Sequence, residues 1–186
     1  MMTLLQAAVW AARPWADLYA DSTVVKASVA FLHVGGLMAA GGFALAADRA
    51  TLRMCGRPDA ERRAWVRELA SIHRPVVAGL AVVVFSGLLM LAADIEALFP
   101  SPLFWVKMAG FILLLLNGRA LQRAGGRLAT AMGAAAESDE AGEIVEAGDG
   151  AADHAESWKM LRAASLRSGG LWFVVLFLGT LLTAAA

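Results

Sequence analysis

The chain is poor in the residues that build most compact soluble sites. It has one cysteine, one tyrosine and three histidines among 186 residues. Because Cys55 is alone, no disulfide can form within the chain, and a zinc site made of Cys and His would lack ligands. The sequence also has no glycine-rich phosphate loop and no nucleic-acid-binding motif, so we expect no nucleic-acid partner.

Apolar residues are what the chain has in excess. They make up 59% of the sequence, and the mean hydropathy is +0.62, whereas soluble domains are usually about 45–50% apolar. Each apolar stretch is near the roughly 20 residues that cross a bilayer, and a helix satisfies its own backbone polar groups there. We therefore predict an all-α integral membrane four-helix bundle, with spans at 24–47, 75–93, 102–121 and 169–186.

The sequence divides into four parts by composition. Trp10, Trp15 and Tyr19 stand among small apolar residues near the start, which is typical of an amphipathic segment at a membrane interface. Eight of the sixteen acids lie between Glu137 and Glu156 in an Ala- and Gly-rich stretch, which predicts a disordered or weakly helical insert. The predicted parts are an outer interfacial segment (1–23), spans one to three (24–132), the acidic cytoplasmic insert (133–157) and span four (158–186).

Arginine predicts the orientation. The connection between spans one and two holds seven arginines, whereas the next connection holds Asp94 and Glu96 and no basic residue. Basic connections face the cytoplasm. Both termini are therefore predicted to face outward.

His33 is the most informative polar residue within a span. It lies nine residues beyond Val24, too deep for its short side chain to reach the interface. At helical spacing its neighbours are Ala30, Gly36, Leu37 and Ala40. This small, flat face would suit a macrocycle whose metal is ligated by the imidazole. It would equally suit a close helix contact in which His33 hydrogen-bonds across the interface.

Lys107 lies at a similar depth in span three. We expect the Cα atoms of Lys107 and His33 to differ in depth by about 6 Å. Lys107 would then ligate a metal when neutral, pair with a haem propionate when charged, or simply extend to the outer interface. His73 is expected roughly 15 Å deeper than His33, so these two histidines would not ligate one haem.

Several short motifs resemble a group of small bacterial membrane proteins. They are Lys26-x6-His33 with the glycines after it, Ala47-Asp48-Arg49, Ser86-Gly87 and Phe104-Trp105-Val106-Lys107-Met108. The group comprises the copper-resistance protein D family, the membrane-bound protoporphyrinogen oxidases and uncharacterised haem-binding-type families. The resemblance implies a multi-pass protein of the bacterial plasma (inner) membrane, a haem b on His33, and a role for Lys107 after Trp105. It also implies removal of hydrogen from a porphyrinogen and electron transfer to a membrane acceptor.

Three functions follow as expectations. The first is a membrane b-type haem-binding redox protein, in the form of a protoporphyrinogen oxidase-like oxidoreductase, with His33 as axial ligand and Lys107 beside the cofactor. The second is a copper-handling membrane protein that uses His33 with Met38 or Met108. The third is a non-catalytic membrane subunit whose acidic insert contacts a partner. Beyond the lipid bilayer, the expected partners are a membrane electron donor or acceptor and, through the small-residue faces, a second copy of the chain.

Overall fold

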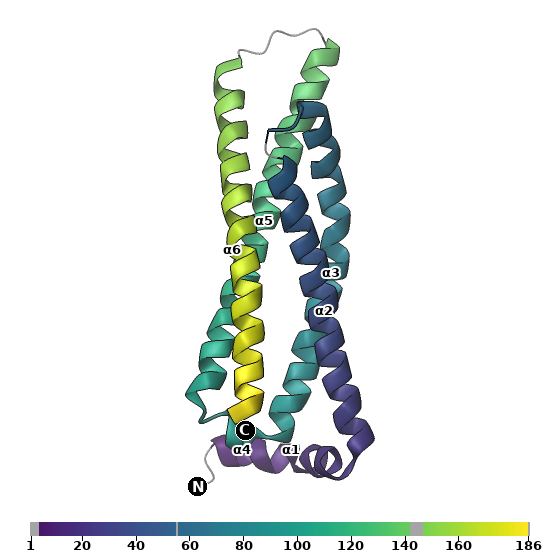
Figure 1. The fold of residues 1–186 in the computed structure, drawn as a ribbon, viewed down its shortest axis with the longest axis vertical. Coiled ribbons are helices and arrows are strands. Elements are labelled where there is room, and N and C mark those ends of the chain that lie inside the picture. Colours follow the sequence, from purple (N-terminus) through teal and green to yellow (C-terminus); the bar gives the residue numbers. More distant parts are fainter. Residues whose placement is uncertain (1–3, 55, 142–146, 186) are drawn as a thin grey trace. The chain divides into compact units, whose positions relative to one another are not determined.

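The fold is all-helical wherever it is described, as the sequence predicted. A computed structural model describes residues 4–54, 56–141 and 147–185, and no strand occurs among them. The helices are shown in Figure 1. They are α1 (Leu4–Asp21), α2 (Thr23–Met54), α3 (Asp59–Ala93), α4 (Ile95–Leu98), α5 (Pro102–Ala141) and α6 (Ala147–Ala185).

Helices α2, α3, α5 and α6 are long and apolar enough to cross a membrane. Their outward-facing residues are apolar too: Phe31 is 76% exposed and Phe173 is 68% exposed. Apolar surface of this extent is unfavourable in water and is typical of a surface that contacts a membrane or another protein. The four predicted spans are therefore present as helices of suitable length and composition.

The helices extend well beyond the apolar stretches that predict them. α2 continues to Met54 and α3 begins at Asp59, so most of the arginine-rich connection is helical and Pro75 lies inside α3. Hydropathy marks only the apolar part of a helix, while Ala, Arg and Glu favour helix in water as well. The turn between these helices uses Gly56, whose φ of 86° is a conformation that glycine adopts without strain.

The chain forms two compact units. Unit 1 contains Met1–Gly42, Pro75–Ala109 and Phe177–Ala186, and unit 2 contains Phe43–Arg74 and Gly110–Leu176. Each long helix contributes to both units. The candidate sites below each lie within one unit.

In unit 1, α2 and α3 approach closely through small residues. A Cβ atom placed on Gly79 would lie 2.9 Å from the backbone nitrogen of Ala40 and 3.0 Å from the carbonyl oxygen of Gly36. Farther along the same helix pair, His33 lies beside Ser86 and Gly87. Residues with lower numbers on α2 contact residues with higher numbers on α3, so the two helices run antiparallel. Gly36, Ala40 and Gly79 thus set the distance between them.

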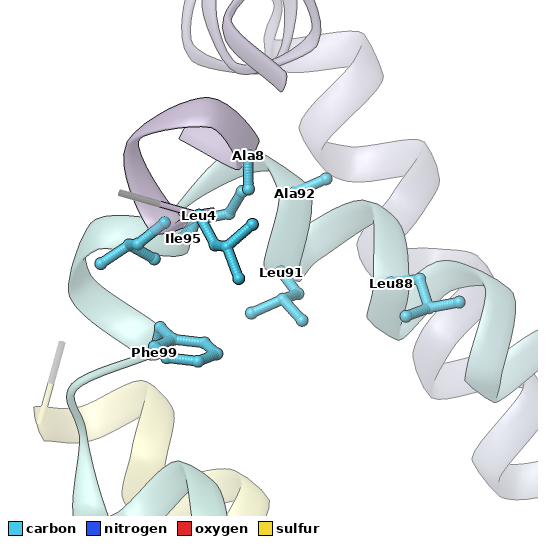
Figure 2. A pocket seen from close by; sticks show the side chains of 8 residues that line it. Leu4, Ala8, Leu88, Leu91, Ala92, Ile95 and Phe99 are labelled. Atoms are coloured by element: carbon cyan, nitrogen blue, oxygen red, sulfur yellow. The ribbon is translucent and has the colours of Figure 1, made fainter. Parts of the chain in front are cut away.

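Helix α1 has no buried residue. It contacts α3 through one hydrogen bond and through apolar side chains. The indole nitrogen Nε1 of Trp15 donates a hydrogen bond to the Leu89 carbonyl, at 2.8 Å. A hollow of about 640 Å³ lies between α1, α3 and α4, with only apolar side chains around it (Figure 2). Its lining residues are Leu4, Leu5, Ala8, Leu88, Leu91, Ala92, Ile95 and Phe99.

Buried apolar side chains from three helices form a packed core in unit 2. The core contains Val66 of α3, Ala124 and Leu128 of α5, and Trp158 and Leu161 of α6.

Within the predicted acidic insert, residues 133–141 and 147–157 belong to α5 and α6, while 142–146 lie outside the described residues. Where it is described, this part is helical.

Candidate functional site in unit 1

The small-residue face of α2 is packed against α3. Gly36 and Ala40 are buried there with Val29, and a Cβ on Gly36 would lie 3.0 Å from the Gly79 carbonyl oxygen. Sequence alone left this face open to a macrocycle or to a helix, and the structure places a helix on it. His33 shares the face and is half-buried at the edge of the contact.

The imidazole of His33 is oriented by a serine. His33 Nδ1 lies 3.0 Å from Ser86 Oγ, and the Ser86 side chain is fully buried. The Ser86 hydroxyl donates to the Val82 carbonyl at 2.6 Å. A hydroxyl has only one proton to donate, so Ser86 accepts from an N–H at Nδ1. This arrangement selects the neutral tautomer in which Nε2 carries the lone pair.

Glycine provides room for the ring. A Cβ on Gly87 would lie 3.4 Å from His33 Cε1, and 3.8 Å from Nδ1. These separations are ordinary van der Waals contact, so Gly87 packs directly against the imidazole. Ser86 thus hydrogen-bonds to the ring, and the neighbouring Gly87 lies against it.

Lys107 of α5 lies in the same unit as His33, and its side chain packs against Gly179 of α6. A Cβ on Gly179 would lie 3.7 Å from Lys107 Cε and 3.9 Å from Nζ. The Lys107 ammonium is also near enough to act electrostatically on the His33 imidazole. An ionisable side chain within an apolar helix is energetically costly to remove from water and commonly serves a function. The two residues that the sequence singled out thus lie in the same unit.

Other candidate ligands do not join them. His73 contacts the amide of Gln122 in unit 2. Met38 is 73% exposed, because it lies five positions after His33 and thus on another side of α2. Within the described part of the chain, no three His, Cys, Asp or Glu side chains gather into a metal-binding group. The copper hypothesis, which pairs His33 with Met38 or Met108, depends on methionine and stays a prediction.

A buried polar group in unit 2 was not predicted from the sequence. Asp48 of α2 lies beside Ser165 and Ser168 of α6, and all three side chains are buried. Their only sequence signals are a carboxylate at the end of the first apolar run and two serines spaced by three. Neither signal indicates that the two helices meet there.

Known proteins do not identify this site. No family model, no curated protein and no solved structure matches the chain.

Proposed function

We propose that the chain is an integral membrane redox protein that binds haem b through Nε2 of His33. One observation carries this proposal: Ser86 holds the Nδ1–H side of the imidazole, so that Nε2 carries its lone pair. Histidine ligands of metals usually donate their other ring N–H to such a partner, which fixes the ring and raises its basicity.

The membrane setting is part of the proposal. Four helices of suitable length, with apolar outward surfaces, support insertion. The arginines between α2 and α3, and those following span three, support an orientation with both termini outside. Together with the motif resemblance, this favours the inner membrane of a bacterium.

The residues of unit 1 fit a haem by their donor chemistry. His33 would supply one imidazole ligand, while Lys107 would provide a positive charge for a propionate or act as a second ligand. The apolar surroundings would tune the reduction potential by excluding water. When bound, the haem would supply one-electron chemistry, and a protoporphyrinogen oxidase-like reaction would pass electrons to a membrane acceptor.

An absorption spectrum tests the proposal directly. We expect protein purified in mild detergent from haem-replete cells to show a Soret band. Its dithionite-reduced minus oxidised spectrum should show a sharp α-band, at close to one haem per chain. A colourless preparation in which the helices are intact by circular dichroism would contradict the proposal.

Substitution of Ser86 tests the tautomer argument. The Ser86→Ala variant removes the acceptor for Nδ1–H, so His33 should ligate less well and haem affinity should fall about 10- to 100-fold. The measurement is haem titration of apoprotein followed at the Soret band. Ser28→Ala is the matched control, because Ser28 is exposed on the same helix as His33. Equal affinity of wild type and Ser86→Ala would show that Ser86 does not support a ligand.

A further inference from the structure

Unit 2 buries a carboxylate that the proposed redox function does not use. Asp48 is 7% exposed. Among the described residues, no Lys, Arg or His forms an ion pair with it. An ionised carboxylate removed from water without a partner is strongly unfavourable. The buried carboxyl therefore holds a proton or is balanced by a bound cation.

Two oxygen atoms at this place lack partners. Asp48 Oδ2 and Ser165 Oγ are buried, and neither has a hydrogen-bond partner among the described residues. Both Ser165 and Ser168 nevertheless lie beside the carboxylate, and these serines are 2% and 3% exposed. Buried polar groups are almost always satisfied, so an unpaired oxygen on each of two facing helices calls for a species between them, which is either a proton on the carboxyl or a bound cation.

The chemistry of the surrounding atoms narrows the class of that species. The side-chain donors are oxygens, which hard cations prefer. The site carries a single negative charge, which one monovalent cation neutralises. A divalent ion would leave an excess positive charge in a buried place.

We propose that Asp48, Ser165 and Ser168 bind an alkali metal cation, with Na⁺ as the probe ion. The cation would bridge Asp48 Oδ2 on α2 and Ser165 Oγ on α6, with the Ser168 hydroxyl as a third ligand. It would thereby hold the two helices together in unit 2. This site is separate from His33 and does not depend on haem.

Thermal unfolding of the detergent-solubilised full chain tests the site. NaCl is substituted for choline chloride at constant ionic strength and pH, and tryptophan fluorescence follows unfolding. We expect Tm to rise with Na⁺ and to saturate, by about 5 °C when Na⁺ is a hundredfold above its Kd. The Asp48→Asn variant should lose this response, since it keeps the shape of the side chain and removes the charge. Ser165→Ala should bind Na⁺ about tenfold more weakly.

The controls separate a bound ion from general effects of salt. Asp94→Asn changes an exposed acid that makes no side-chain cap bond, so it should respond to Na⁺ as the wild type does. An equal Tm of wild type in choline and Na⁺, or an equal rise in Asp48→Asn, would overturn the proposal. So would stabilisation by acid in place of Na⁺, because Asp48 would then hold a proton. If Asp48→Asn does not fold, Ser165→Ala is the deciding variant. A Na⁺ titration of Ser165→Ala that matches the wild type would then overturn the proposal.

Discussion

The His33→Ala variant is expected to insert and fold but to lose its haem. The substitution removes the imidazole, which is the one histidine ligand in the proposed haem site. Bound haem per chain should therefore fall about tenfold or more. Even the loss of a residue that only supports a metal ligand lowers metal affinity by about this factor. The measurement is the ratio of Soret to protein absorbance after purification in the same detergent.

The fold should survive because the substitution leaves no buried polar group unpaired. The Ser86 hydroxyl keeps its hydrogen bond to the Val82 carbonyl, and His33 is only half-buried. The cost in stability should be that of one hydrogen bond, about 1 kcal/mol. This separates loss of cofactor from loss of fold.

A second histidine provides the matched control. His73 lies in unit 2 and contacts Gln122, so His73→Ala should retain haem. Full haem content in His33→Ala would eliminate His33 as a ligand. Equal loss in both variants would indicate that the haem depends on general stability and would also contradict the assignment.

The Gly79→Ala variant is expected to be the most disruptive single methyl addition in unit 1. The new Cβ would lie 2.9 Å from the Ala40 nitrogen and 3.0 Å from the Gly36 oxygen. Both are backbone atoms and cannot rotate away, so α2 and α3 must separate. Overpacking of this kind costs about 1–3 kcal/mol. Unfolding in mixed micelles of mild detergent and dodecyl sulfate measures the change.

Another glycine of α2 makes the control. A Cβ on Gly42 would meet no atom within 4 Å, and alanine is the better helix former by about 1 kcal/mol. Gly42→Ala should therefore be neutral or stabilising. If Gly79→Ala unfolds at the same detergent fraction as Gly42→Ala, the close contact between α2 and α3 is wrong. Because His33 and Ser86 face each other on these helices, Gly79→Ala should also weaken haem binding.

The four apolar helices could be predicted from sequence because hydropathy over some twenty residues is a local property. Their ends could not be predicted in the same way. The segment after Asp48 is polar, yet α2 and α3 both extend into it, since helix propensity does not require apolar residues. His33 and Lys107 could be selected for a related reason: a polar side chain in an apolar stretch is visible without knowledge of its neighbours.

Sequence by itself thus determined the all-helical class, the four apolar helices and the two polar residues of unit 1 that stand out within them. Only the tertiary structure decided which residues meet. His33 and Ser86 are 53 positions apart, and Asp48 meets two serines of the last helix. The small face of α2 suited a macrocycle or a helix equally well, and α3 occupies it. Such contacts depend on how helices pack and in which register, and no periodicity within one helix specifies its partner.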